Sequence, residues 1–145
     1  MVCPDVNVLV YANRLDSEDH ERYRDWLLEV ANGDEAYGLS DLVLSGFLRI
    51  VTHPRIFNQP TSLVAALAFA DALRSRPNRV VLAPGPRHWG IFADLCRRAD
   101  VRGNRVPDAY FAALAIETGS EWITADHGFS RFPGLRWRHP LQDRR

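Results

Sequence analysis

Lysine is absent from this sequence of 145 residues, and all 18 of its basic residues are arginines. The 18 acidic residues balance this charge, and a net charge of zero excludes binding to polyanions through overall charge alone. Arginines gather at 97–105 and 131–145. There they form either a solvated surface or a rim that contacts phosphate.

Cysteine is scarce, because only Cys3 and Cys96 are present. They are too few for a disulfide framework and favour a reducing compartment. Long apolar runs are also lacking, since the longest, 63–73, contains Asp71 and is too short to cross a bilayer. The first residues show neither the basic nor the apolar region of a secretory signal. We therefore expect a cytoplasmic protein without a membrane segment.

Apolar residues make up 46% of the chain and charged residues 25%, which is typical of a globular protein of one domain. Short apolar segments alternate with segments of helical periodicity. The expected strands are 2–4, 36–39, 79–83, 121–125 and 135–138, and the expected helices are 7–13, 17–32, 41–52, 61–73, 87–99 and 108–118, with a turn or short helix at 127–132. Strands separated by helices predict an α/β fold with a small parallel sheet flanked by helices.

Three aspartates stand where strands end or helices begin. Asp5 follows the first strand, Asp126 follows the strand 121–125, and Asp108 begins a helix just after Pro107. Each has an ordinary structural explanation, as a turn former or as an acid at a helix N-terminus. Because ligand sites of parallel sheets lie beyond the carboxyl ends of the strands, we expect the three to converge.

Converging carboxylates favour a metal ion. Two unit charges about 4 Å apart repel by roughly 4 kcal/mol at an effective dielectric near 20, and a divalent cation reverses that sign. Oxygen ligands without histidine or cysteine favour Mg²⁺, with Mn²⁺ as an alternative, and such a site suits hydrolysis of phosphate esters by metal-activated water. The five histidines show no zinc spacing, and the sequence has no Walker loop or nucleophile elbow.

Four segments, in their order and spacing, resemble PIN-domain proteins. They are DVNVLVYA at 5–12, THPRIF at 52–57, VPDAYFAALA at 106–115, and TADHGF at 124–129 followed by FPGLR at 132–136. THPRIF is similar to a segment of one branch of VapC toxins within that family. Because the resemblance spans nearly the whole chain, we expect a PIN domain at 1–141 and a C-terminal tail at 142–145.

The resemblance implies a magnesium-dependent endoribonuclease, the toxin of a VapBC toxin–antitoxin pair. Its substrate would be structured RNA such as transfer or ribosomal RNA, and a cognate VapB-type antitoxin would silence it. Asp5, Asp108 and Asp126 would be the catalytic residues and hold the metal, with Asn7 and Thr124 in support. A homodimer is also expected, as is usual in the family, since the helices 41–52 and 63–73 are unusually apolar.

Two glycines depart from the family pattern. Gly46 stands where many PIN domains place a glutamate, and Gly128 stands where relatives often have a further acid. Asp41 is no simple substitute, because five residues turn a helix by roughly 140° and advance it about 7.5 Å. We therefore expect three acids rather than four, and a close helix approach at Gly46.

Two other functions stay open. The chain is either an active nuclease or a catalytically degenerate PIN domain that binds RNA or protein, and metal-dependent turnover separates the two. A phosphatase with an aspartyl nucleophile is a third reading, but its Asp-x-Asp pattern is absent because Asn7 stands in place of the general acid.

Overall fold

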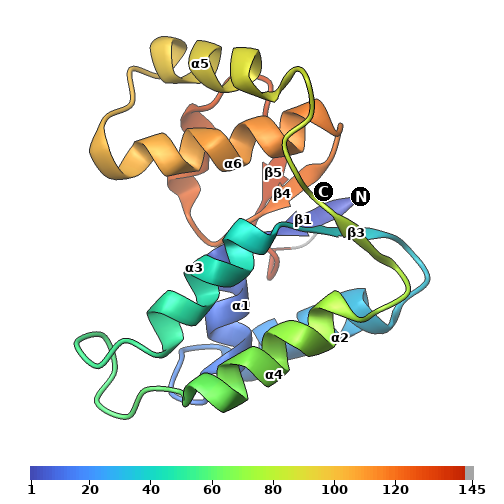
Figure 1. The fold of residues 1–145 in the computed structure, drawn as a ribbon, viewed down its shortest axis with the longest axis vertical. Helices are drawn as coiled ribbons and strands as arrows, with labels where there is room; N and C mark the ends of the chain where they lie inside the picture. The colour runs from blue at the N-terminus through green and yellow to red at the C-terminus, as the bar shows by residue number, and fades with distance from the viewer. Residues whose placement is uncertain (143–145) are drawn as a thin grey trace.

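The computed structural model describes residues 1–142, which form one five-stranded sheet flanked by helices (Figure 1). The strand order is β3-β2-β1-β4-β5, and every neighbouring pair is parallel. The strands are β1 (Val2–Pro4), β2 (Tyr37–Leu39), β3 (Arg79–Val81), β4 (Glu121–Ile123) and β5 (Trp137–Arg138). The expected α/β fold with a small parallel sheet is confirmed.

The helices divide between the two faces of the sheet. They are α1 (Val6–Asn13), α2 (His20–Asn32), α3 (Asp41–Val51), α4 (Leu63–Arg74), α5 (His88–Arg98) and α6 (Val106–Glu117), with the 3₁₀ turns η1 (Gly103–Arg105) and η2 (His127–Arg131). In Figure 1, α5 and α6 lie above the sheet and α1 to α4 lie below it. No helix within residues 1–142 has the length and apolar character needed to cross a membrane.

The element boundaries differ from the sequence expectations in a few places. Four strands are one or two residues shorter than expected, because their parallel ladders are shorter than the apolar segments. The second helix begins at His20, since Asp19 adopts a left-handed conformation with φ 58° that interrupts a helix. The turn η1, which the sequence did not predict, leads directly into α6.

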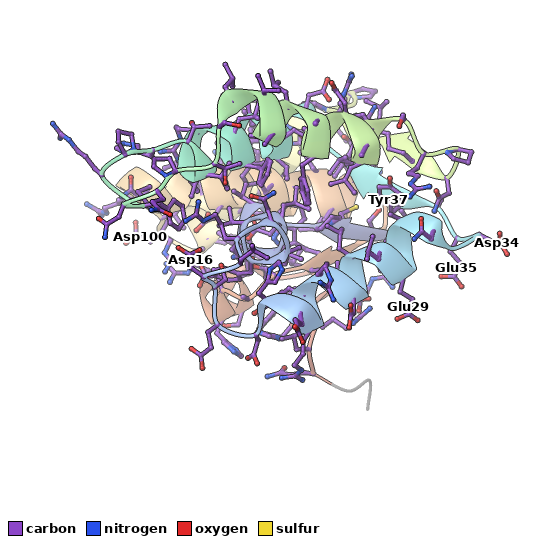
Figure 2. The ribbon with its side chains drawn as sticks, turned by 90° about the horizontal axis from the view of Figure 1, so that it is seen from below. Asp16, Glu29, Asp34, Glu35, Tyr37 and Asp100 are labelled. Carbon is purple, nitrogen blue, oxygen red and sulfur yellow. The ribbon has the colours of Figure 1, made fainter. Side chains whose placement is uncertain are left out.

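The core lies around the two central strands and the helices that cover them. Leu9 of α1, Phe47 of α3 and Trp122 of β4 have no exposed surface. Helix α6 is buried on several sides, and its small side chains let the sheet and α5 approach it closely; they are Ala109, Ala112, Ala113 and Ala115. On β2, the buried Tyr37, labelled in Figure 2, donates a hydrogen bond from its hydroxyl to the carbonyl of Leu73, 2.5 Å away, which ties β2 to α4.

The residues 142–145, which the sequence suggests are a tail, lie almost wholly outside the described part of the chain. The bounds 1–141 for the domain stay a prediction.

Close packing at Gly38 of β2 gives a first prediction. A Cβ at this position would lie 2.6 Å from the Sγ of Cys3, which is fully buried and has no room to retreat. Gly38→Ala should therefore lower the free energy of unfolding by about 1–3 kcal/mol in urea titrations. Cys3→Ala in the same chain should recover part of that loss, because the two side chains compete for one space.

Gly90 of α5 is the matched control, because a Cβ there meets nothing within 4 Å. Gly90→Ala should raise stability by up to about 1 kcal/mol through helix propensity. Equal effects of the two glycine substitutions would contradict the close contact between β1 and β2.

Candidate active site

The candidate site lies where the strand order changes direction, between β1 and β4. These central strands are paired in parallel, with Pro4 opposite Ile123, so both end at the same edge of the sheet. The backbone N–H of Asp5 donates to the carbonyl of Ile123, 2.8 Å away. Residues 119 positions apart, Asp5 and Thr124, are thereby placed side by side at a topological switch point, where open α/β sheets bind ligands.

Each of the three aspartates stands at the N-terminus of a helix or helical turn. Asp5 caps α1 by accepting a hydrogen bond from the N–H of Val6 at 2.6 Å. Asp108 lies in the first turn of α6, and Asp126 caps η2 by accepting from the N–H of Gly128 at 2.8 Å. Unpaired N–H groups at helix N-termini favour negative charge, so these positions stabilise carboxylates that face one another.

All three aspartates line one pocket of about 760 Å³. The remaining wall is mostly apolar and comes from α1, α3, α6 and the loop after α3; it includes Val10, Tyr11, Leu42, Ile50, Ile56, Phe57, Phe111 and Phe129. The structure thus brings together the residues that the sequence singled out, while their catalytic and metal-binding roles stay predictions.

Thr124 and Asn7 hold Asp5 in place. The hydroxyl of Thr124 donates to Asp5 Oδ2 at 2.8 Å and accepts from Asn7 Nδ2 at 3.1 Å and from the N–H of Asp126 at 3.0 Å. Asn7 also accepts from the N–H of Ala125 at 3.1 Å. Because Thr124 is fully buried and its hydroxyl is fully engaged, it fixes Asp5 relative to the backbone of Asp126.

Burial at the site opposes ionisation of two of the acids. It raises the pKa of Asp5 to about 6, and the charges of Asp108 and Asp126 add to that rise, while hydrogen bonds from Thr124 and Val6 oppose it. Burial also raises the pKa of Asp108, although Arg105 acts in the opposite direction. A bound cation would favour the charged form of both acids, since an opposite charge stabilises a carboxylate.

Arg105 lies between two of the carboxylates. Its Nη1 donates to Asp108 Oδ2 at 3.0 Å and to Asp126 Oδ2 at 2.9 Å. Two carboxylates that converge on one positive charge have the chemistry of a site for a hard cation, so the residues fit a divalent ion. Within residues 1–142, no group of three or more acids, histidines or cysteines is arranged so that it could hold a metal ion. Arg105 occupies the space between two of the proposed ligands.

Asp41, His127 and several surface acids lie outside the pocket that holds the three aspartates. Asp41 pairs with Arg74 and Arg79, so it does not replace the acid absent at Gly46, as expected. His127 packs edge-on against the ring of Trp137, with 5.4 Å between the ring centroids, and does not line the pocket. Figure 2 shows Glu29, Asp34 and Glu35 at the outer edge of the molecule, pointing away from it.

The two departures from the family pattern have distinct structural explanations. A Cβ at Gly46 would lie 3.0 Å from Val6 Cγ2, so this glycine allows α3 to approach α1, as expected. A Cβ at Gly128 would lie 2.5 Å from Arg105 Nη1, so this glycine leaves room for the arginine.

The arginine run 97–105 separates into two groups. Arg98 pairs with Asp94 and Arg102 pairs with Asp100 on the surface, as a solvated face would. Arg105 instead reaches the acids, which the sequence analysis missed although Arg105 and Asp108 have the i,i+3 spacing of a helical ion pair. The terminal residues Arg144 and Arg145 lie outside the described part of the chain.

Three further pocket residues were also missed: Ser45, Arg49 and Asn104. Arg49 is exposed and has no carboxylate within ion-pair distance among residues 1–142. Nothing in their sequence spacing distinguishes them, because α3 carries Ser45 and Arg49, η1 carries Asn104, and only the three-dimensional fold brings these two elements to one pocket.

The fold and the site together define an α/β domain of the doubly wound type, with an acidic pocket beyond its two central strands. The PIN domain family profile matches residues 2–135. A VapC ribonuclease of Mycobacterium bovis is 50% identical over 141 residues, which is 97% of this chain and 96% of that protein. Ribonuclease VapC25 of Mycobacterium tuberculosis is 36% identical over 136 residues, 94% of this chain and 96% of its own.

Solved structures show the same fold. VapBC2 from Rickettsia felis, bound to a DNA fragment from its promoter, superposes with a TM-score of 0.69 at 19% identity, covering 96% of this chain and 98% of that one. DNA-bound VapBC from Salmonella typhimurium gives a TM-score of 0.65 at 20% identity, covering 97% and 98%. This chain belongs to the PIN domain family and, within it, to the VapC group.

The network around Thr124 generates a second prediction. Thr124→Val keeps the shape of the side chain but removes one buried hydrogen bond, to Asp5, and two part-buried ones, from Asn7 and the backbone of Asp126. The free energy of unfolding should fall by about 1–3 kcal/mol, measured by urea denaturation. Thr118→Val, which removes a hydroxyl at the far end of α6, should cost about 1 kcal/mol or less. Equal losses in the two variants would argue against a special role for Thr124.

Proposed function

We propose that this protein is a metal-dependent endoribonuclease and the toxin of a VapBC-type toxin–antitoxin pair. The observation that most supports the activity is the convergence of Asp5, Asp108 and Asp126 in one pocket from three separate helix N-termini. A relative named VapC ribonuclease, 50% identical over nearly the whole chain, supports RNA as the substrate class.

Asp5, Asp108 and Asp126 hold the ion, which is Mg²⁺ or alternatively Mn²⁺. When bound, the ion polarises the scissile phosphate and lowers the pKa of the attacking water. Asn7 and Thr124 keep the Asp5 carboxylate in a fixed orientation, through hydrogen bonds of 3.3 and 2.8 Å to its Oδ2. In-line hydrolysis leaves a 5′-phosphate and a 3′-hydroxyl.

Arginines near the pocket orient the RNA backbone. Arg49 stands on the pocket wall formed by α3. Arg131 is exposed at the end of η2, where its Nε donates to the carbonyl of Gly128 at 2.8 Å. Its positive charge acts to lower the pKa of Asp108, against the rise caused by burial. Because guanidinium groups bind phosphate in a bidentate manner, these two side chains suit contacts to phosphates beside the scissile bond.

The partners are a cognate VapB-type antitoxin, structured RNA such as transfer or ribosomal RNA, and a second copy of the chain. Two of the solved structures with this fold are VapBC assemblies bound to DNA. We place the protein in the cytoplasm, where such RNA is found, and assign the activity to a PIN domain that spans 1–141.

The alternative is a catalytically degenerate PIN domain that binds RNA or protein without cleaving it. Gly46 and Gly128, which stand where other family members have acids, favour this alternative. Turnover of RNA that requires a divalent ion would exclude it.

The cleavage test uses single substitutions of the acids. Asp5→Asn and Asp108→Asn should each reduce Mg²⁺-dependent cleavage of total RNA by at least about 100-fold, because each removes a charge that holds the ion. Sequencing the RNA ends identifies the cut site and the 5′-phosphate. Circular dichroism verifies that each variant is folded.

Asp94→Asn is the matched control, since Asp94 is an exposed acid of α5 that pairs only with Arg98. It should cleave like the parent. Undiminished cleavage by both Asp5→Asn and Asp108→Asn would refute the mechanism, and no cleavage by the parent with Mg²⁺ or Mn²⁺ would favour the degenerate domain.

The proposed homodimer has its own test. Helix α4 exposes Leu63 by 59%, Val64 by 81% and Leu67 by 41%, an apolar surface that association would bury. Val64→Asp should lower the mass measured by light scattering from that of a dimer towards 16.5 kDa, without loss of thermal stability. Leu28→Asp on α2 is the control and should leave the mass unchanged. A parent that is monomeric at micromolar concentration would contradict the dimer.

A further inference from the structure

Arg105 holds the position of a cation in the acidic pocket. A single nitrogen, Nη1, donates to Oδ2 of both Asp108 and Asp126, at 3.0 and 2.9 Å. Asp108 and Asp126 come from different elements, α6 and η2, so the guanidinium joins two parts of the site that are separate in the sequence. This is a contact between an arginine and two of the three proposed metal ligands.

The surroundings are shaped to admit Arg105. A Cβ on Gly128 would lie 2.5 Å from Nη1 of Arg105 and 2.8 Å from Oδ1 of Asp126, so a larger residue would require one or both of these side chains to shift. The backbone of Gly128 is not in the left-handed region, since its φ lies outside the range that favours glycine. Close approach of the arginine is therefore the physical reason for glycine at this position.

Arg105 is also free to leave. Its side chain keeps 37% of its surface exposed, and it belongs to the short turn η1 rather than to the core. Within the described residues 1–142, the side chain of Arg105 donates hydrogen bonds only to Asp108 and Asp126 and none to the strands. Rotation of the side chain into solvent needs no unfolding, and partly exposed ion pairs of this kind are individually weak.

The space between the two carboxylates admits one cation at a time. An ion held by Oδ2 of Asp108 and Oδ2 of Asp126 would need the position that Nη1 now occupies. Arg105 contributes one positive charge there and a divalent ion contributes two, so the ion has the stronger attraction to the pair. Whether Arg105 or the ion occupies the position between Asp108 and Asp126 then depends on the concentration of the ion.

We infer that Arg105 is a built-in competitor for the metal ion, which neutralises Asp108 and Asp126 until a divalent cation displaces it. This inference rests on the proposed metal site. Competition from Arg105 makes the affinity of the site for the ion lower than the acids alone would give. It also sets the ion concentration above which the ion occupies the site.

The test measures Mn²⁺ binding by isothermal titration calorimetry, with the full chain and without RNA. Arg105→Gln should bind Mn²⁺ roughly tenfold more tightly than the parent, because the ion no longer displaces a guanidinium from two carboxylates. Arg105→Lys keeps a positive charge at the carboxylates and should stay within about twofold of the parent. The matched control is Arg102→Gln, which removes an exposed arginine that pairs only with Asp100 and should leave the affinity unchanged.

A second readout is thermal unfolding with and without Mn²⁺. The stabilisation by the ion should be larger in Arg105→Gln than in the parent, because tighter binding to the folded state raises the midpoint further. Circular dichroism establishes that the variants are folded before either measurement.

The outcomes separate this inference from the proposed function. If the parent binds Mn²⁺ and cleaves RNA but Arg105→Gln binds the ion equally or more weakly, the competition is refuted and the nuclease stands. The competition is also refuted if Arg105→Lys gains as much affinity as Arg105→Gln. If neither parent nor variant binds Mn²⁺ and the parent does not cleave RNA, both the proposed function and the inference fail.

Discussion

The mutual repulsion of three buried or half-buried carboxylates is the constraint around which the site is organised. Asp5, Asp108 and Asp126 line one pocket, where burial raises the pKa of Asp5 and Asp108 and so opposes their charged forms. The fold opposes this cost with groups of its own: helix N-termini beneath each acid, the hydroxyl of Thr124 on Asp5, and the guanidinium of Arg105 between the other two. Each group is a donor or a positive charge, so together they offset part of the cost of keeping three carboxylates in one pocket.

The parallel order of the strands is what makes these contacts available. Because β4 lies beside β1 and both end at one edge, Asp5 and Thr124 meet although they are distant in sequence. The connection through α5 brings Asp108, in the first turn of α6, to the same pocket, and the rest of α6 then leads to β4. A change in strand register by one residue would point Thr124 away from Asp5, since successive side chains of a strand face opposite sides. The geometry of the site therefore depends on the pairing of two three-residue strands.

The sequence predicted the acids but not their neighbours, and the reason is physical. Asp5, Asp108 and Asp126 follow from the rule that ligand sites lie beyond strand ends, which needs only the order of the elements. The absence of a helical substitute at Gly46 follows from the pitch of a helix. Arg105 stands in a run with Arg97, Arg98 and Arg102, and only the three-dimensional packing distinguishes the one that meets acids from those that meet solvent. The strand ends depend in the same way on where the ladders stop, which local sequence does not specify.

The two glycines give the site a particular charge balance. Val6 packs where a side chain at Gly46 would lie, and Arg105 packs where a side chain at Gly128 would lie. Because both residues are glycines, neither position adds a negative charge to the pocket. Three carboxylates and one guanidinium leave a formal charge of about −2 when all are ionised, and a divalent ion that displaced the guanidinium would leave about −1. On the proposed function, a second ion would have to draw its ligands mainly from the phosphate of the substrate, as Mg²⁺ commonly does. Glycine at position 128 thus adds no negative charge to the pocket and leaves room for the positive charge of Arg105.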